Sequence, residues 1–332
     1  MTILVTGGAG YIGSHMVHEL VDTGEAVVVL DNLSTGLRSA LPPNAPLTVG
    51  STGDVDLVSR LITTRRVNAI IHFAASIVVP DSVRDPLGYY RNNTMNTCLL
   101  LQTAIALGVR YVIFSSTAAV YGNPATIPVR EDAPTHPVSP YGNSKLMSEI
   151  MLHDAAHAHD LRFVVLRYFN VAGADPKLRT GQSTPNATHL IKVAAEAAIG
   201  RRPKVEIFGT DYPTPDGTCI RDYIHVTDLV RAHLSALDYL RGGGNSITLN
   251  CGYGHGYSVR EVLGAVGRMS GREFPVTLSG RRAGDPVAIV ADVQRIRATL
   301  DWRPNYDNLD TIVGHALAWE RRLASERGIA TN

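Results

Sequence analysis

The chain has 332 residues, of which 45% are hydrophobic and 18% charged, and its formal net charge at pH 7 is +1. This length allows a large buried core in two lobes, and the near-zero charge gives no basis for binding nucleic acid or an anionic membrane. No apolar run approaches the roughly 18 residues of a membrane-spanning helix, and the sequence predicts no signal peptide. Cys98, Cys219 and Cys251 form no paired framework, which indicates a reducing compartment, so we expect the protein in the cytoplasm.

The chain opens with an apolar strand that leads through a glycine turn into a helix. Gly7, Gly10 and Gly13 are spaced three residues apart, and apolar positions recur at helical spacing from residue 12. This arrangement suits a pyrophosphate at a helix N-terminus, although glycines also punctuate ordinary turns. The next apolar run, residues 26–30, ends in Asp31, which can accept a hydrogen bond from a ribose 2′-OH and would repel a 2′-phosphate. The turn therefore predicts bound NAD rather than NADP.

Strands and helices then alternate along the chain. The apolar patterns predict helices at 54–66, 92–107 and 141–159, and strands at 69–75, 111–116 and 163–168. Such alternation predicts an α/β fold with a doubly wound parallel sheet of the Rossmann type.

The composition changes near residue 172, where loops containing glycine and proline separate shorter elements. We therefore expect an NAD-binding domain at 1–172 and a smaller C-terminal α/β substrate-binding lobe at 173–332, lying over the ends of the sheet strands. A helix is predicted at 226–240, and we leave open whether 226–250 packs back onto the first domain.

Candidate catalytic side chains follow the strand at 111–116. That strand delivers Ser115, Ser116 and Thr117 to the carboxyl edge of the sheet, and Tyr141 and Lys145 share one face of the next helix because they are four residues apart. Bringing the pKa of a tyrosine from about 10 to near 7 needs roughly 4 kcal/mol, which a lysine and a cationic nicotinamide in a dry site can supply. Tyr141 is thus a candidate general base and Thr117 its hydroxyl partner, although Tyr-x-x-x-Lys also occurs by chance on helices.

Six stretches carry a resemblance to a known family: TGGAGYIGSH at 6–15, SSTAAVYG at 115–122, PYGNSK at 140–145, LRYFN at 166–170, GTDYP at 209–213 and RDYIH at 221–225. Over nearly its whole length the chain resembles the extended short-chain dehydrogenase/reductase family. Within that family it is similar to the enzymes that invert C4 of UDP-hexoses such as UDP-glucose and UDP-galactose.

The resemblance implies roles for the residues at the sheet edge. Tyr141 takes the proton of the sugar 4-OH while hydride passes from C4 to NAD, and the 4-keto sugar then rotates and takes the hydride back on its other face. Lys145 binds the nicotinamide ribose and lowers the pKa of Tyr141, while Thr117 stands where these enzymes carry Ser or Thr. NAD ends each turnover as it began, so it should stay tightly bound. The residues expected to bind it are Gly7, Gly10, Tyr11, Ile12, Gly13, Asp31, Asn32, Ser51, Phe73, Ala74, Ala75, Asn92, Ser115, Tyr141, Lys145 and Tyr168.

The resemblance also implies a firm grip on UDP by the second lobe. Asn170, Arg221 and Arg282 resemble its phosphate contacts and Asp285 the acid that binds the ribose, while Leu190 and Phe208 resemble the residues that flank uracil. Guanidinium groups match phosphate oxygens well. The complete set expected to bind substrate is Thr117, Tyr141, Asn170, His189, Leu190, Phe208, Arg221, Arg282, Asp285 and Ile289.

Three positions depart from the family pattern. Ser51 stands where many members carry an acid that contacts adenine, and Ile77 or Val78 replaces a lysine that some members place near the pyrophosphate. Ile289 occupies the position of the sugar-size gate, but it is neither the large tyrosine that excludes N-acetyl sugars nor a small residue that admits them. Acceptance of N-acetylated substrates is therefore left open.

Several alternatives accompany this interpretation. Another UDP-sugar (an N-acetylhexosamine, a pentose or glucuronate) is the alternative substrate, and a non-catalytic NAD-binding regulator is disfavoured because the Thr/Tyr/Lys set is complete. A 4,6-dehydratase is disfavoured because Ala118 and Ala119 stand where its acid pair would follow Thr117. The histidines at 153, 157 and 159 are interpreted as a solvated helix face, and no metal is expected. The resemblance further implies a homodimer paired through 92–107 and 141–159.

Overall fold

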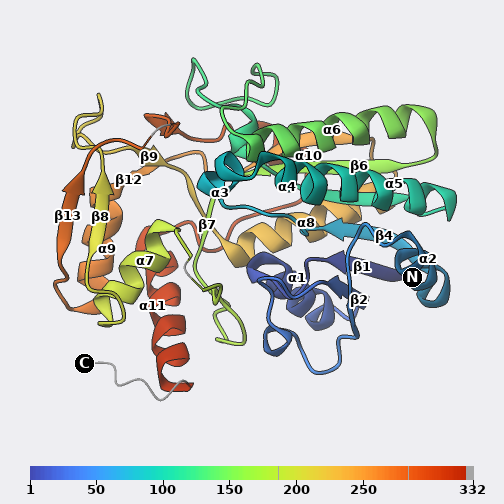
Figure 1. Ribbon diagram of the computed structural model, residues 1–332, viewed down its shortest axis with the longest axis horizontal. Coiled ribbons are helices and arrows are strands. Elements are labelled where there is room, and N and C mark those ends of the chain that lie inside the picture. Colours follow the sequence, from blue (N-terminus) through green and yellow to red (C-terminus); the bar gives the residue numbers. More distant parts are fainter. Residues whose placement is uncertain (186, 283, 327–332) are drawn as a thin grey trace.

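A seven-stranded parallel sheet forms the centre of the computed structural model, which describes residues 1–185, 187–282 and 284–326 (Figure 1). The undescribed residues all fall within the region 173–332 expected to bind substrate. The strand order across the sheet is β11-β6-β5-β4-β1-β2-β3. In chain order these strands are β1 (Thr2–Thr6), β2 (Ala26–Asp31), β3 (Leu47–Val49), β4 (Val67–His72), β5 (Tyr111–Thr117), β6 (Arg162–Tyr168) and β11 (Ile247–Cys251).

Helices cover both faces of this sheet because its strands are apolar on both sides. Ile3 and Val5 of β1 point into one hydrophobic cluster, with α1 and α8, whereas Leu4 points into a second cluster on the opposite face, with α2, α5 and α6. The helices are α1 (Tyr11–Asp22), α2 (Val55–Arg65), α5 (Asn96–Ala106), α6 (Pro140–Ala158) and α8 (Val226–Arg241). The predicted doubly wound parallel sheet is confirmed.

Short elements link the strands and helices of the sheet region. They are the 3-10 turns η1 (Arg38–Ala40) and η3 (Ala118–Val120), the helices α3 (Val79–Arg84) and α4 (Pro86–Tyr89), and the π-helical η2 (Tyr90–Met95). The helix predicted at 92–107 therefore starts as a π-turn and becomes α-helical only at Asn96.

The remaining elements gather beside the carboxyl edge of the sheet, at the left of Figure 1. Their strands form the pair β7 (Asn170–Ala172) and β10 (Tyr223–His225), the set β12 (Tyr257–Ser258), β9 (Ile220–Arg221) and β14 (Ala288–Ile289), and the pair β8 (Val205–Phe208) and β13 (Val276–Ser279). Their helices are α7 (Leu190–Ala198), α9 (Val259–Ser270) and α11 (Leu309–Glu326), and α11 packs on α7 and α9. The short helix α10 (Gln294–Thr299) instead contacts β11 of the central sheet. The chain returns to the sheet with α8, which packs on α1, and with β11, which pairs with β6. The division at 1–172 and 173–332 stays a prediction.

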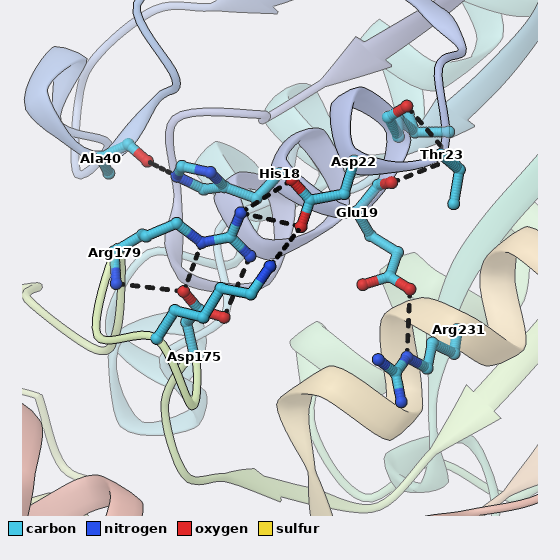
Figure 2. Close-up of polar contacts among 10 residues, drawn as sticks. His18, Glu19, Asp22, Thr23, Ala40, Asp175, Arg179 and Arg231 are labelled. Carbon is cyan, nitrogen blue, oxygen red and sulfur yellow. Dashed lines mark hydrogen bonds and ion pairs between the residues drawn. The ribbon is translucent and has the colours of Figure 1, made fainter.

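The loop that leaves β7 is fastened to α1 by charged side chains. Figure 2 shows Arg179 between two carboxylates, donating from Nε to Asp175 at 2.6 Å and from Nη1 to Asp22 at 2.8 Å. On the other side of α1, Arg231 of α8 donates to Glu19 at 3.0 Å. These contacts fix α1 between the connecting loop and α8.

Candidate active site

Two glycines, one in the turn between β1 and α1 and one in the first turn of α1, leave no room for a side chain. Gly7 has a φ of +68°, and a Cβ there would lie 2.6 Å from the backbone nitrogen of Ala74, while a Cβ on Gly13 would lie 2.1 Å from the carbonyl oxygen of Gly7. Gly10 caps α1 without any side-chain hydrogen bond, which leaves N–H groups of the first helical turn without a capping acceptor. Tyr11 and Ile12 begin this turn. The backbone thus offers the close approach and the donors that a pyrophosphate requires.

Asp31 closes the far side of this turn at the end of β2. The side chain is 7% exposed; its Oδ2 accepts from the Ala9 N–H at 2.9 Å and its Oδ1 from the Leu33 N–H at 2.8 Å. Each carboxylate oxygen retains a lone pair, so the group can still accept from a ribose hydroxyl. Asn32 is exposed beside it, and the hydroxyl of Ser51, beyond β3, accepts from the Gly53 N–H at 3.1 Å. These residues fit the adenosine half of NAD.

The other residues expected to bind NAD follow the carboxyl ends of neighbouring strands. Phe73, Ala74 and Ala75 lie just beyond β4, because the strand predicted at 69–75 ends at His72. Ser115 lies near the end of β5, and Tyr168 ends β6. They converge on one edge, where doubly wound sheets bind nucleotides.

Asn92 lies on η2 and donates to the hydroxyl of Ser76 at 3.0 Å. The neighbouring Asn93, which the sequence analysis did not single out, is 2% exposed and donates to the carbonyl of Ser76 at 2.9 Å and to the hydroxyl of Ser144 at 3.0 Å. The π-turn directs this amide inward, so Asn93 links the loop after β4 to α6, the helix that carries Tyr141 and Lys145. No signal in the sequence pointed to Asn93, because a π-turn interrupts the helical spacing from which buried positions are predicted.

Thr117, Tyr141 and Lys145 meet at this edge of the sheet. Thr117 ends β5, opposite Tyr168 of β6, and α6 begins at Pro140, where Ser139 caps it by accepting from the Gly142 N–H at 3.2 Å. Lys145 is 3% exposed, its Nζ donates to the Ser115 carbonyl at 2.9 Å, and it lies 4.8 Å from the centre of the Phe114 ring. The helix start and the strand end thus bring the three side chains together.

Burial shifts the pKa values of Tyr141 and Lys145. It raises the pKa of Tyr141 to about 12, although the hydroxyl of Thr117 opposes the shift, and it lowers the pKa of Lys145 to about 8, although the charge of Glu149 opposes that shift. The sequence predicts that a lysine and a cationic nicotinamide together can bring the pKa of the tyrosine near 7. In the protein alone, burial is the largest influence on both pKa values, because both groups are almost completely buried.

A second group of predicted residues gathers on the C-terminal elements. Asp285 lies between two arginines, 3.0 Å from Nε of Arg282 and 4.0 Å from Nη2 of Arg221, and the Arg282 guanidinium stacks 4.6 Å from the centre of the Phe208 ring. Ile289 of β14 pairs with Arg221 of β9 and is 6% exposed. Two cations, a carboxylate and an aromatic ring in one place match the phosphate, ribose and base of a nucleotide diphosphate.

The remaining predicted residues lie around a cavity between α1, β7 and α7. Asn170, His189 and Leu190 line one small cavity together with Tyr11, whose hydroxyl donates to the Gly173 carbonyl at 2.7 Å. Burial lowers the pKa of His189, so this histidine is neutral near pH 7. The cavity therefore lies between the start of α1 and the start of α7.

Two further expectations concern metals and membranes. Among the described residues, no group of three or more His, Cys, Asp or Glu side chains is arranged to hold a metal ion. His153 and His157 are exposed on α6 and His159 is exposed just after its end, and His153 packs edge-on against Phe163. None of the helices within 1–185, 187–282 and 284–326 has the length and apolar character to cross a membrane.

Comparison with known proteins gives a consistent result. Residues 3–252 match the model of the NAD dependent epimerase/dehydratase family. The chain is 58% identical to the UDP-glucose 4-epimerase of Azospirillum brasilense over 99% of its own length and 94% of that protein. Its structure is similar to the crystal structure of UDP-glucose 4-epimerase from Brucella ovis in complex with NAD, with a TM-score of 0.93, 45% identity and coverage of 96% and 97% of the two chains. The corresponding values for the Bifidobacterium longum enzyme in complex with NAD⁺ and UDP are 0.92, 36%, 97% and 98%.

Proposed function

The chain belongs to the NAD dependent epimerase/dehydratase family, and we propose that it is an isomerase that inverts C4 of UDP-glucose and UDP-galactose. One observation carries this proposal: the buried Thr117, Tyr141 and Lys145 lie at the same edge of the sheet as the turn at Gly7, and a separate group of two arginines, a carboxylate and a phenyl ring lies on the C-terminal elements. The first group suits proton and hydride transfer, and the second suits retention of UDP.

The residues around the turn fit NAD. Gly7 and Gly13 leave room for the pyrophosphate, and Asp31 stands at the end of β2 for the adenosine ribose. A bound NAD would accept the hydride from C4 of the sugar and serve as its donor within the same turnover. Because the cofactor is regenerated, the enzyme needs NAD to stay in place rather than exchange.

Tyr141 moves the proton of this reaction. In the forward half its phenolate takes the proton of the 4-OH group, and in the reverse half the phenol returns it to the oxygen of the 4-keto sugar. Thr117 shares this proton by hydrogen bonding, and Lys145 supplies a positive charge that favours the phenolate. The pKa of about 12 that burial imposes on Tyr141 makes such a charge necessary.

The second lobe holds UDP while the sugar turns. Arg221 and Arg282 provide forked donors for the diphosphate, Phe208 provides a flat apolar surface for the base, and Asp285 provides an acceptor for the ribose. Inversion requires that both faces of the keto sugar reach the hydride donor in turn. Strong binding must therefore reside on UDP, since a firm hold on one sugar orientation would prevent the rotation.

Turnover without added cofactor tests this proposal. Purified protein is incubated with UDP-galactose alone, and UDP-glucose and NADH are measured. UDP-glucose without net NADH is the expected result, because the resident cofactor is reduced and reoxidised in each cycle. Failure to form UDP-glucose even with NAD added would contradict the proposed reaction.

We also propose that the protein is a homodimer paired through η2, α5 and α6. Met95 of η2 and Met147 and Ile150 of α6 are 58%, 43% and 52% exposed, and these two elements pack against each other. Light scattering is expected to give twice the chain mass for the native protein and the monomer mass for Ile150→Asp. The matched control is Met269→Asp on α9, an equally apolar exposed position, which should stay dimeric.

A cytoplasmic location is proposed on the basis of the three cysteines, which are all free thiols. Cell fractionation with detection of the native protein is the direct measurement. Recovery from an oxidising compartment would contradict it.

A further inference from the structure

A buried ion pair lies directly behind the catalytic lysine. Glu149 of α6 is 2% exposed and Arg167 of β6 is 7% exposed. The Arg167 Nε lies 3.1 Å from both carboxylate oxygens of Glu149, and its Nη2 donates to Oε2 at 2.6 Å. The hydroxyl of Ser116 donates to the other oxygen, Oε1. One carboxylate thus joins α6 to both strands of the β5–β6 pair.

The register of these strands places the ion pair one residue from the reacting groups. Ser116 stands opposite Arg167, and the next pair along is Thr117 opposite Tyr168. On α6, Glu149 lies one turn after Lys145 and two turns after Tyr141, so all three occupy the same side of the helix. Any shift of Glu149 against the strands would move Tyr141 relative to Thr117.

Glu149 also supplies the negative charge nearest to Lys145 along this helix face. Burial lowers the pKa of Lys145 to about 8, and the charge of Glu149 acts against that loss. Arg167 extends away from the lysine, since its Nη1 donates to the Tyr121 hydroxyl at 3.0 Å and to the Glu131 carbonyl at 3.2 Å. The carboxylate, rather than the guanidinium, therefore dominates the field at Lys145.

The other titratable groups around α6 do not compete with this pair. Burial lowers the pKa of His72 on β4 to about 3 and raises the pKa of Tyr121 after η3 to about 12; it also lowers the pKa of His153 and raises that of Tyr89 on α4, so all four are neutral near pH 7. The charged side chains of α3 and η2, Asp81, Arg84 and Arg91, are accessible to solvent, which screens them.

We propose that Glu149, held by Arg167 and Ser116, is a positioning residue for the reaction: it keeps Lys145 as an ammonium ion and fixes α6, with Tyr141, against Thr117. This inference rests on the proposed function. It assigns a role in the reaction to a residue that touches neither substrate nor cofactor.

The test is the pH dependence of kcat for epimerisation of UDP-galactose by the NAD-loaded protein carrying Glu149→Gln. Lys145 acts as a cation, so activity is lost as the pH rises through its pKa. When the negative charge of Glu149 is removed, the pKa of Lys145 falls. The alkaline limb of the pH profile is therefore expected to move to lower pH by about one unit or more, with a larger effect on kcat than on KM. Glu149→Asp, which keeps the charge, should retain the native limb. Ser116→Ala, which keeps both charges and removes only the hydroxyl, should retain it as well.

A second variant guards against failure to fold. Glu149→Gln leaves Arg167 buried without its partner, whereas the double variant Glu149→Gln/Arg167→Met removes both charges, a replacement that buried ion pairs often tolerate. The double variant should also show the lowered alkaline limb. If either variant has a lower unfolding temperature but the same alkaline limb of the pH profile as the native protein, Glu149 has only a structural role. That result would overturn the inference. Absence of turnover in the native protein would instead overturn the proposed function.

Discussion

Tyr141→Phe isolates the proton transfer from the rest of the reaction. The substitution removes one hydroxyl and leaves the ring that fills a site only 7% exposed. Since burial raises the pKa of Tyr141 to about 12, phenolate formation near pH 7 requires about five pKa units, or roughly 7 kcal/mol, from the positive charges around it. If the protein stabilises one phenolate to this extent, catalysis depends on that phenolate. We expect kcat to fall by about 10²- to 10⁴-fold, or roughly 3–5 kcal/mol of activation free energy.

The assay follows UDP-glucose formed from UDP-galactose, with UDP-sugar affinity measured by calorimetry. Affinity should stay within about threefold of native, because UDP is held by the second lobe. The native acid limb of kcat, which rises as Tyr141 ionises, should disappear in the variant. Tyr89→Phe is the matched control. Tyr89 is also 7% exposed, it contributes to the raised pKa of Tyr141, and its hydroxyl donates to the Val78 carbonyl at 2.7 Å. The Tyr89→Phe variant should nevertheless keep turnover near native. Near-native turnover by Tyr141→Phe would refute the assignment of the base.

Three further predictions address the cofactor, the connecting loop and the sugar. Asp31→Ser should weaken NADH binding about tenfold and reduce the ratio of NADH affinity to NADPH affinity, both measured by fluorescence titration. An affinity ratio equal to that of the native protein would show that Asp31 is not the residue that selects NADH. Arg179→Met should lower the free energy of unfolding by about 1 kcal/mol at pH 7 and hasten the loss of NAD. Burial raises the pKa of Asp22, but Arg179 outweighs it and holds this pKa below its ordinary value, so the stability advantage of the native protein over the variant should fade as the pH falls below about 4. A variant that unfolds at the same temperature as the native protein both at pH 7 and below about pH 4 would contradict this. Ile289→Ala should raise turnover of UDP-N-acetylgalactosamine relative to UDP-galactose, whereas Val290→Ala, at a neighbouring buried position, should leave the ratio unchanged; equal ratios in both would dismiss the gate.

The fold could be predicted from local patterns because strands and helices of this sheet are set by short apolar periods. The family resemblance drawn from the sequence motifs is likewise confirmed by the match over residues 3–252. Boundaries were less accurate where tertiary contacts decide them. The strand predicted at 69–75 ends at His72, where Gly7 crosses so closely that a Cβ would collide with Ala74. The helix predicted at 92–107 begins as a π-turn that turns Asn93 toward Ser76.

The placement of the candidate catalytic residues could be predicted, but their electrostatics could not. Spacing alone placed Tyr141 and Lys145 on one helical face, and the strand end placed Thr117 beside them. Spacing could not indicate that desolvation would dominate the pKa of the tyrosine, because burial depends on what the rest of the chain packs over the site. Arg167 carried a signal that was available, since a charged residue within an apolar strand needs a buried partner, and Glu149 lies at helical spacing from Lys145.

The contacts of the connecting loop bear on how the sugar can turn. The loop after β7 is tied to α1 by Arg179, and its Gly173 carbonyl accepts the Tyr11 hydroxyl at 2.7 Å, directly beside the glycine turn. Hinge motion between the sheet and the C-terminal elements would have to break these contacts together with those of α8 to α1. The structure therefore favours rotation of the keto sugar about its bonds to a fixed diphosphate over opening of the lobes. The same ties would hold the walls of the cofactor site in place while the sugar turns, which is what a reaction that returns its hydride to the same substrate requires.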